Sequence, residues 1–522
     1  MSEKLVCAVD VGTASARAGI FDRGGRLLSR AERPILLNRP SPARGEHDSE
    51  DIWSAVCAAV RNATSAAGVD GGQVAAICFD ATCSLVLRGR DGSRIGAPAG
   101  CDPRWDTISW FDHRALAEAE ECTATGHEIL QYAGGVMSPE MQVPKLMWLK
   151  RHRPEAWAQT RHVFDLADFL TWRATGSEAR SQCTLACKWT YLPHSRGWSP
   201  DFFSAVGLDD LADRLPARAA PVGSAVGTLT AASAADLGLA AQCVAAAGLV
   251  DAYAGMLGAI GAHGDGSGER HLALVGGTSS CVMWFSAEPQ FLPSAWGPYF
   301  GAALPDLWAS EAGQSATGAL LDHILRLYRQ GSEPQAGDHA AIVARVRELR
   351  ARNPDLGRDI HMLPDFHGNR SPFADPRARG VIHGLGLDAS FDGLCALYWR
   401  ACVAVALGVR HILEHVGASG GVCLHVVGGH ARNPLLMELY ADVTGVPVME
   451  GDAEDAVLLG AAMAAATAAG WYAHLAESCG AMRQQTTARR PDPGRQQAYD
   501  HDFEVFLTLQ RQQRELRALN RF

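Results

Sequence analysis

A strand–turn–strand pattern that occurs twice along the chain is the feature that most constrains the fold. In residues 6–15 an apolar run meets a Gly-Thr turn followed by a serine, and residues 272–280 repeat this order. A second apolar run, 17–22 or 281–285, follows each turn. Internal repetition indicates a fold that builds the same core twice. We therefore predict two domains, 1–265 and 266–522, separated in the glycine-rich segment 261–268.

The segments between and beyond the two repeats alternate between strand-like and helix-like patterns. Residues 48–66 place apolar side chains at helical spacing and stop at Gly68, and residues 456–469 and 496–522 are also predicted helices. Strands are predicted at 26–30 (the second arm of a hairpin with a turn at Gly24-Gly25), 74–79, 84–87, 244–249 and 424–427. Alternating elements of this kind predict an α/β protein.

Charge and composition exclude several classes of protein. The 522 residues are 47% apolar, which is enough for two large cores. Lys plus Arg is 47 against 57 Asp plus Glu, and the net charge of -10 argues against nucleic-acid binding, which depends on basic residues that neutralise phosphates. We expect no nucleic-acid partner.

Membrane and export signals are weak. The first residues do not resemble a signal peptide, and the 14 cysteines include no C-x-x-C pair, as expected of thiols in a reducing compartment. The apolar stretch 239–262 carries Asp251 at its centre, a charge that is costly inside a bilayer. It is interpreted as a buried strand and helix. We expect a cytoplasmic protein without a membrane partner.

The two Gly-Thr turns, Gly12-Thr13 and Gly277-Thr278, are candidate phosphate sites. Successive N–H groups of a glycine turn bind anions, and Thr or Ser hydroxyls add donors. Facing each other across a cleft, the turns would hold a polyphosphate from both sides. The alternative is that both are ordinary hairpin turns. The repetition, together with a third glycine turn at Gly428-Gly429, leaves the two interpretations equally supported.

Two aspartates follow strands at positions suited to chemistry. Asp10 precedes the first turn and is a candidate ligand of Mg²⁺, or else caps the turn backbone. Asp251 is a candidate general base, or else a plain helix N-cap.

Other motifs point elsewhere or nowhere. The sequence contains no G-x-x-x-x-G-K-[ST] motif, which excludes a P-loop nucleotide site. No G-x-G-x-x-G motif follows the first strand, so a Rossmann dinucleotide site is unsupported. His411, Glu414 and His415 match an H-x-x-E-H zinc pattern. Their apolar helix favours helix histidines, and a zinc hydrolase is kept as a remote alternative. Most of the tryptophans are expected in cores.

Several segments, taken together, resemble the FGGY family of carbohydrate kinases. Residues 9–17 and 275–280 resemble the family's two phosphate motifs, 428–433 its adenosine motif, and 145–149 the core of a family signature, whose usual start is replaced by Glu140-Met141-Gln142. The resemblance covers nearly the whole chain. It implies two actin-like, ribonuclease-H-like ATPase domains flanking a catalytic cleft.

Longer segments resemble the ribulokinase group within this family, most closely its D-ribulokinase and ribitol-kinase-like members. They are residues 79–84, 110–114, 187–191, 311–315 and 365–372. The resemblance implies an ATP- and Mg²⁺-dependent kinase that converts D-ribulose to D-ribulose 5-phosphate. Ribitol kinase and L-ribulokinase are the alternatives, and a non-catalytic actin-like nucleotide-binding scaffold is a remoter one. Since many members are dimers, a homodimer is compatible with the resemblance.

The resemblance also implies roles for individual residues. Asp251 would be the catalytic base and would contact the sugar, and Asp10 would help to hold Mg²⁺. The nucleotide would contact Gly12, Thr13, Ser15, Arg17, Gly277, Thr278, Ser279, Gly428, Gly429 and Asn433. The sugar would contact Ala81, Thr82, Trp110, Lys188 and Glu311.

Overall fold

A computed structural model describes residues 4–41, 43–97, 102–264, 270–329, 331–335, 337–418, 420–451 and 455–519. The chain divides into two compact units. Unit 1 comprises Met1–Gly266, Phe285–Ser310 and Ala453–Gln484, and unit 2 comprises Ser267–Trp284, Glu311–Asp452 and Gln485–Phe522. The predicted boundary between residues 265 and 266 lies outside the described residues and stays a prediction.

Unit 1 contains the following elements: β1 (Leu5–Val11), β2 (Ser15–Phe21), β3 (Leu27–Pro34), β4 (Leu37–Ser41), β5 (Arg44–His47), α1 (Ser49–Ala66), η1 (Gly71–Gln73), β6 (Val74–Ala81), β7 (Leu85–Arg88), β8 (Thr107–Ile108), α2 (Leu116–Ala124), η2 (Glu128–Tyr132), α3 (Gln142–His152), α4 (Pro154–Gln159), β9 (His162–Asp165), α5 (Leu166–Thr175), α6 (Gln182–Lys188), α7 (Pro200–Ala205), η3 (Asp209–Arg214), β10 (Ala225–Thr228), α8 (Ala231–Leu237), β11 (Val244–Ala246), β12 (Leu249–Val250), α9 (Asp251–Ile260), η4 (Gly261–His263), β15 (Trp296–Phe300), α14 (Ala456–Ala468) and α15 (Leu475–Ala481).

Unit 2 contains these elements: β13 (Arg270–Gly276), α10 (Gly318–Tyr328), α11 (Asp338–Arg352), β17 (His361–Leu363), β18 (Val381–His383), α12 (Phe391–His415), β19 (Val422–Gly428), η5 (Gly429–Arg432), α13 (Pro434–Thr444), β20 (Val448–Gly451), β21 (Thr486–Arg489) and α16 (Pro493–Leu519). Two strands contain residues of both units, β14 (Ser280–Ser286) and β16 (Trp308–Gln314).

The main sheet of unit 1 is mixed. Its strand order is β10-β11-β6-β1-β2-β3, and β12 also pairs with β6. β1 runs antiparallel to β2 and parallel to β6, so the carboxyl ends of β1 and β6 meet at one edge. This edge lies beside the Gly12-Thr13 turn, because that turn joins β1 to β2.

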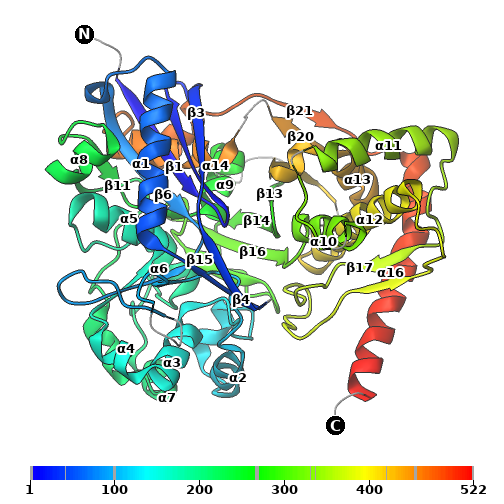
Figure 1. The fold of residues 1–522 in the computed structure, drawn as a ribbon, viewed down its shortest axis with the longest axis horizontal. Helices are drawn as coiled ribbons and strands as arrows, with labels where there is room; N and C mark the ends of the chain where they lie inside the picture. The colour runs from blue at the N-terminus through cyan, green and yellow to red at the C-terminus, as the bar shows by residue number, and fades with distance from the viewer. Residues whose placement is uncertain are drawn as a thin grey trace. The chain divides into compact units, whose positions relative to one another are not determined.

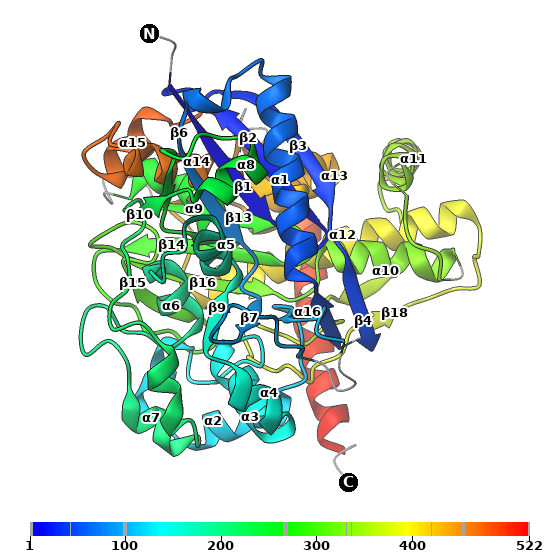
Figure 2. The ribbon, with the colours of Figure 1, turned by 60° about the vertical axis from the view of Figure 1, so that its left-hand side comes forward.

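Helices α1 and α14 cover the opposite faces of this sheet, as Figures 1 and 2 show. The side chains of a strand alternate between the faces. On β2, Ala18 and Ile20 join the core under α1, whereas a Cβ added at Gly19 would meet the Leu458 side chain of α14. Both faces are therefore buried, which explains why β1 is apolar from Leu5 to Val9 rather than alternating.

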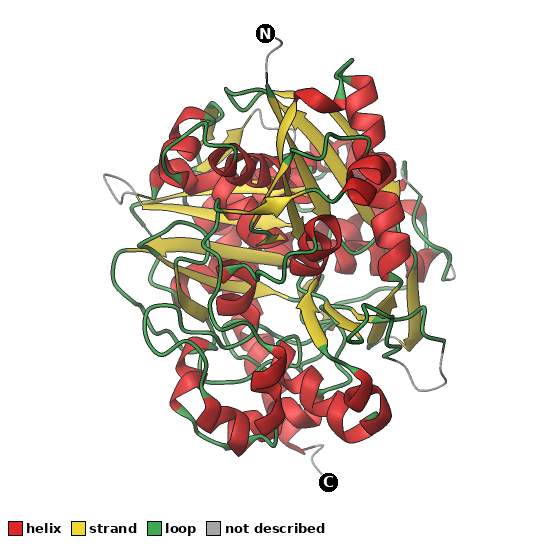
Figure 3. Ribbon diagram, turned by 90° about the vertical axis from the view of Figure 1, so that its left-hand side faces the viewer, coloured by secondary structure: helices red, strands yellow, loops and turns green. Residues whose placement is uncertain are grey.

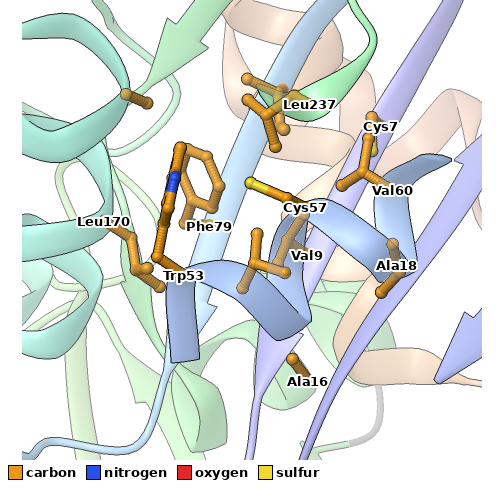
Figure 4. Packing of buried hydrophobic residues seen from close by; sticks show 14 of the residues in the cluster. Cys7, Val9, Ala16, Ala18, Trp53, Cys57, Val60, Phe79, Leu170 and Leu237 are labelled. Atoms are coloured by element: carbon orange, nitrogen blue, oxygen red, sulfur yellow. The ribbon is translucent and has the colours of Figure 1, made fainter. Parts of the chain in front are cut away.

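The core under α1 is shown in Figure 4. The Trp53 ring of α1 packs against the Phe79 ring of β6, with a centroid separation of 6.5 Å. Leu170 and Leu237 close the cluster from α5 and α8. The helical spacing of apolar residues in 48–66 thus corresponds to one buried face of α1, which begins after Asp48 as its N-cap.

Unit 2 repeats the topology of the first core. β13 runs antiparallel to β14 and parallel to β19, as β1 does with β2 and β6. β20 extends β19 in parallel and β21 pairs with β20 in the antiparallel sense. The predicted duplication is confirmed at the level of strand pairing, and strands accompanied by helices give the α/β architecture seen in Figure 3.

The predicted elements agree with the observed ones to within a few residues, except at two places. The predicted strand 244–249 is two short strands, β11 and β12, followed by α9. The predicted C-terminal helix is α16, and residues 520–522 of it lie outside the described residues. The expectation that most tryptophans lie in cores agrees with the burial of Trp110, Trp148, Trp189, Trp284, Trp296 and Trp308.

One described helix, α12, is long and apolar enough to cross a membrane by length and composition alone. Within its most apolar window, 78% is buried inside the structure, as in the core helix of a folded domain. The apolar stretch 239–262 forms β11, β12 and α9 within unit 1, so the predicted single strand is divided in two and the predicted helix is present.

Candidate active site

Three aspartates of unit 1 gather where β1, β6 and β12 end. Asp10 and Asp80 are partners in the parallel register of β1 and β6. Leu249 of β12 pairs with Asp80 and Val250 with Ala81, so Asp251 follows at the same edge. The parallel pairing therefore brings together carboxyl groups that lie far apart in the sequence.

Burial sets the protonation of this cluster. Asp10 is 1% exposed, and burial raises its pKa from 3.8 to about 7, although the Arg17 charge acts in the opposite direction. Burial also raises the pKa of Asp80 well above its ordinary value, and the neighbouring charges of Asp10 and Asp251 raise it further. Asp80 accepts a hydrogen bond from no N–H or O–H donor in the described part of the chain.

Arg17 is the cation that the fold itself places beside the cluster. It lies opposite Asp10 in the antiparallel register of β1 and β2, and its Nη2 is 2.7 Å from Asp10 Oδ2. Its Nη1 is 3.7 Å from Asp455 Oδ2, and Arg30 Nε is 3.3 Å from the same oxygen. The Asp10 carboxyl is thus held by Arg17 and does not cap the turn.

Asp251 is the first residue of α9 and is partly exposed. The N-cap is Val250, whose side chain makes no capping hydrogen bond, and Asp251 follows it as the first helical residue, with its Oδ1 accepting from the adjacent Ala252 N at 2.7 Å. The N-cap alternative for Asp251 is therefore wrong. Its carboxylate lies in the first turn, where the helix dipole stabilises negative charge.

The Gly12-Thr13 turn is tight, and part of it is available to an anion. Gly12 N donates to Ser15 O at 3.0 Å, whereas the backbone N–H groups of Thr13 and Ala14 have no backbone acceptor among the described residues. Thr13 Oγ1 accepts a hydrogen bond from Trp110 Nε1 at 3.0 Å. The Ser15 hydroxyl donates to Glu32 Oε1 at 2.7 Å, so it is already used within unit 1.

Four of the residues expected at the sugar belong to unit 1, as this edge does. Ala81 ends β6, Thr82 follows it, and Trp110 reaches the turn through Thr13. Lys188, 3% exposed, lies with its Nζ 4.2 Å from the centre of the Trp296 ring. The pKa of the Cys83 thiol is raised by burial and affected by the charges of Lys188 and Asp251, which places both near Cys83.

The second Gly-Thr turn lies in unit 2, between β13 and β14. Gly277 N donates to Ser279 O at 2.8 Å, and Thr317 N and Ala319 N both donate to Thr278 O. A Cβ added at Gly277 would meet nothing within 4 Å. The turn is therefore anchored from one side and open at Gly277.

His430 supports this turn from β19's side. Its Nε2 lies 3.2 Å from Gly277 O and its Nδ1 lies 2.7 Å from Tyr440 Oη. Burial lowers the pKa of His430 to about 4, so the ring is neutral near pH 7. Because a carbonyl can only accept, Nε2 carries the proton and Nδ1 accepts from Tyr440.

The glycine turn at the end of β19 is close-packed against β13. Gly276 and Gly428 are register partners, and a Cβ on Gly428 would lie 2.5 Å from Gly276 O. Gly428 also has φ +82°, a conformation that glycine tolerates best. Gly429 is exposed, and Asn433 caps α13 by accepting from Leu435 N at 3.0 Å.

Glu311 lies on β16 and is 2% exposed, in unit 2. The predicted site residues therefore fall into two groups. Unit 1 holds Asp10, Gly12, Thr13, Ser15, Arg17, Ala81, Thr82, Trp110, Lys188 and Asp251, and unit 2 holds Gly277, Thr278, Ser279, Glu311, Gly428, Gly429 and Asn433.

The H-x-x-E-H pattern on α12 does not assemble a metal site. His411 packs edge-on against the rings of Phe503 and Phe506, and burial lowers its pKa to about 4. Glu414 accepts from Arg410 Nε at 3.0 Å. These contacts favour the interpretation of His411 as a core histidine.

Sequence reasoning did not assign roles to four residues that the structure places in the site. Asp80 ends an apolar strand exactly as Asp10 does, and that shared position was a usable signal. Lys145 and His430 stood inside motifs that the resemblance quoted. Trp296 gave no local signal, because its approach to Lys188 arises from tertiary packing.

The residues present fit both a magnesium ion and a phosphate group. Mg²⁺ prefers oxygen ligands, mainly carboxylate and water, and Asp80 presents two buried carboxylate oxygens without a donor next to Asp10. Each Gly-Thr turn offers N–H groups with no backbone acceptor in the described part of the chain, which suits phosphate oxygens.

The matches to family models cover most of the chain. Residues 5–258 match the N-terminal domain, and residues 272–469 the C-terminal domain, of the FGGY family of carbohydrate kinases. The chain therefore belongs to the FGGY family of carbohydrate kinases.

Three curated relatives illustrate the range of similarity. An FGGY carbohydrate kinase domain-containing protein of Danio rerio is 42% identical, over 98% of both chains, and that of Homo sapiens is 40% identical, over 99% of this chain and 98% of the other. A D-ribulokinase of Saccharomyces cerevisiae is 36% identical, over 89% of this chain and 72% of the relative.

Solved structures confirm the fold. A xylulose kinase from Rhodospirillum rubrum superimposes with a TM-score of 0.76 at 24% identity, covering 98% of this chain and 99% of the other. A Plasmodium falciparum glycerol kinase solved with ADP gives 0.73 at 13% identity, covering 97% and 98%. The predicted α/β, two-domain fold of this family is thus confirmed.

Proposed function

We propose that this chain transfers the γ-phosphoryl group of ATP to the terminal hydroxyl of a pentulose, with D-ribulose as the preferred substrate and D-ribulose 5-phosphate as the product. The observation that carries the proposal is the partly exposed Asp251 carboxylate beside the two buried carboxyl groups of Asp10 and Asp80, at the strand edge that adjoins the Gly12-Thr13 turn. The 36% identity to a D-ribulokinase supports the choice of sugar.

In this proposal Asp251 is the general base. Its carboxylate accepts the proton of the sugar hydroxyl while that oxygen forms a bond to the γ-phosphorus and the bond from phosphorus to the β–γ bridging oxygen breaks, releasing ADP. General base catalysis contributes about 10²- to 10⁴-fold. A partly exposed position at a helix N-terminus keeps such a carboxylate ionised and within reach of a substrate.

Asp10, with Asp80 beside it, is the proposed site of Mg²⁺. A bound Mg²⁺ would neutralise charge on the phosphates of the nucleotide. Arg17 orients the Asp10 carboxyl through their 2.7 Å ion pair. The Gly12-Thr13 turn is the proposed phosphate contact in unit 1, and Gly277, Thr278 and the Gly428-Gly429 turn are proposed nucleotide contacts in unit 2. We also propose nucleotide contacts at Ser15, Ser279 and Asn433, each of which makes a hydrogen bond within its own unit as well.

The sugar is proposed to contact Ala81, Thr82, Trp110, Lys188 and Glu311. Lys188 is held by the Trp296 ring, which limits its motion and presents its ammonium to hydroxyl or carbonyl oxygens. Trp110 offers an aromatic surface of the kind that packs against a sugar ring or chain.

The test is an assay of ADP release with Mg-ATP across D-ribulose, L-ribulose, D- and L-xylulose, ribitol, L-arabinitol and glycerol. Preference for D-ribulose is the expected result. Preference for ribitol or L-ribulose would keep the mechanism and replace the substrate. ADP release that no sugar or polyol stimulates would refute the kinase proposal and favour a nucleotide-driven scaffold.

The variant Asp251→Asn tests the base. Turnover is expected to fall about 10²- to 10⁴-fold while sugar binding changes by only a few-fold, because the amide keeps the shape and loses the basicity. Asp70→Asn is a matched control, since Asp70 is exposed, caps the short helix η1, and asparagine caps equally well. Near-wild-type turnover of Asp251→Asn would remove Asp251 from the role of base.

A further inference from the structure

Every polar group of Trp110 has a partner inside unit 1. Its backbone N–H donates to Ser84 Oγ at 3.2 Å, its carbonyl accepts from Lys145 Nζ at 3.2 Å, and its indole Nε1–H donates to Thr13 Oγ1 at 3.0 Å. The side chain is 9% exposed and meets the Phe111 ring edge-on. Two hydrogen bonds hold the backbone of Trp110 and a third holds its indole ring, so the ring has little freedom to change its orientation.

Lys145 fixes the main chain beneath this tryptophan. It is fully buried on α3, and its three ammonium hydrogens match three carbonyl acceptors, those of Ser109, Trp110 and Glu140, each at 3.2 Å. A buried ammonium with every donor satisfied is a strong anchor, because losing one bond would leave a charged donor unpaired. The carbonyl of Trp110 is therefore immobilised from below.

The hydrogen bond between Trp110 and Thr13 has a fixed direction. An indole nitrogen can only donate, so the threonine oxygen must accept. The hydroxyl hydrogen of Thr13 is then left to donate elsewhere. Thr13 sits in the tight turn where the N–H groups of Thr13 and Ala14 have no backbone acceptor among the described residues. The Thr13 hydroxyl and the N–H groups of Thr13 and Ala14 are consequently available to one anion, whereas Gly12 N is bonded to Ser15 O.

A second connection ties the turn to the same loop. Thr82 N donates to Val11 O at 3.0 Å, and the hydroxyls of Thr82 and Ser84 are 3.1 Å apart. Together with the bonds from Trp110 to Ser84 and to Thr13, these contacts close a ring through the turn. Trp110 cannot shift without straining the turn, and the reverse is equally true.

We propose that Trp110 is a positioning residue for the phosphate turn, because its indole N–H commits the Thr13 hydroxyl to donating toward a phosphate oxygen. One side chain thus serves both the sugar side and the phosphate turn. The inference rests on the proposed function, in which the Gly12-Thr13 turn binds nucleotide phosphate. It adds that loss of the Trp110 indole N–H, on the sugar side, weakens the binding of the nucleotide even when no sugar is present.

The experiment measures the binding of Mg-ADP alone by titration calorimetry. Trp110→Phe keeps an aromatic ring and removes the N–H. We expect its affinity for ADP to fall about five- to tenfold, equivalent to about 1–1.4 kcal/mol, the net value of one hydrogen bond. Thr13→Val should cause at least this loss, the double variant should bind no more weakly than Thr13→Val, and Thr13→Ser, which keeps the hydroxyl, should bind like the wild type.

Trp157→Phe is the matched control. Its Nε1 donates to Asp210 Oδ2 at 2.8 Å, also within unit 1, so the same indole N–H is removed from another side-chain oxygen, here that of a carboxylate. We expect unchanged affinity for ADP. Equal binding by Trp110→Phe and Trp157→Phe, or strictly additive losses in the double variant, would overturn the inference. Wild-type protein that binds no ADP would instead overturn the proposed function itself, and the inference with it.

A spectroscopic measurement covers the case in which Trp110→Phe does not fold. In ¹⁵N spectra of the wild type, the indole resonance that changes position when Thr13→Val is introduced is assigned to the N–H bonded to Thr13. This resonance should move when ADP is added without sugar, because the hydroxyl that accepts from it then donates to phosphate. A resonance that ADP leaves in place would overturn the inference.

Discussion

Helices α9 and α14 of unit 1 approach so closely that two glycines are required between them. A Cβ added at Gly460 would lie 1.9 Å from Ala254 O, and one added at Gly258 would lie 2.0 Å from Ala456 O. Ordinary van der Waals contact starts at 3.4 Å. The substitution Gly460→Ala therefore forces the two helices apart by about 1.5 Å, a gap that forfeits much of their dispersion contact.

The magnitude follows from two opposing effects. Overpacking of this severity costs about 3 kcal/mol, at the upper end of the usual range, whereas alanine gains about 1 kcal/mol over glycine in helix propensity. The net loss of unfolding free energy is about 2 kcal/mol. Because α9 begins at Asp251, the same displacement moves the proposed base, and kcat is expected to fall by at least tenfold.

Urea denaturation and ADP release measure the two effects on the same preparations. Gly480→Ala is the matched control, since Gly480 lies near the end of α15 and a Cβ there would meet nothing within 4 Å. It should gain up to about 1 kcal/mol and keep full activity. A Gly460→Ala protein as stable as Gly480→Ala would show that the helices separate freely and would refute the reasoning.

Two further predictions concern the charged cluster and the glycine turn. Burial raises the pKa of Asp80 above its ordinary value of 3.8, so in metal-free buffer the folded protein retains a proton that the unfolded chain loses, and stability falls as pH rises above about 4. Asp80→Asn removes this dependence, and its amide can donate to Asp10. In thermal unfolding, the unfolding free energy of the variant relative to the wild type should rise by about 1.4 kcal/mol per pH unit until the pKa of the folded state is reached, and turnover should be lower. Parallel pH profiles of stability would contradict this prediction. Gly428→Ala places a Cβ 2.5 Å from Gly276 O at a φ of +82°, so the affinity for ADP, measured by calorimetry, should fall at least tenfold. Gly420→Ala is the control and should bind ADP normally, because a Cβ there would meet nothing within 4 Å. Equal ADP binding by the two variants would show that the turn does not touch the nucleotide.

Local chemistry explains which parts of the fold could be predicted. Strands and helices such as 5–10 and 48–66 follow from short apolar patterns, since burial of one face or both depends on side-chain spacing. The Gly-Thr turns follow from glycine's conformational freedom. Because the same local pattern recurs at residues 272–280, the duplicated core was also within reach, and the strand pairing of β13 repeats that of β1.

The site was predictable only where a residue's own neighbours revealed it. Asp10 lies at the carboxyl end of β1 and Asp251 follows β12, and both lie at the same sheet edge. Asp80 has the same position in its own strand as Asp10, which was a usable signal, but its pairing beside Asp10 could not be predicted, because nothing along the chain indicates that β6 would pair with β1. The proposed roles of all the nucleotide and sugar contacts stay predictions.

The sequence by itself determined the class of fold, the repeated strand–turn–strand core and the strand-end aspartates, because each depends on interactions within about ten residues of chain. Tertiary structure alone decided how those groups are used. It made Arg17 the partner of Asp10, gave the Ser15 hydroxyl to Glu32, and aimed the indole of Trp110 at Thr13. These choices depend on which strands and loops meet in space, and the free energy of such long-range contacts is absent from any local pattern.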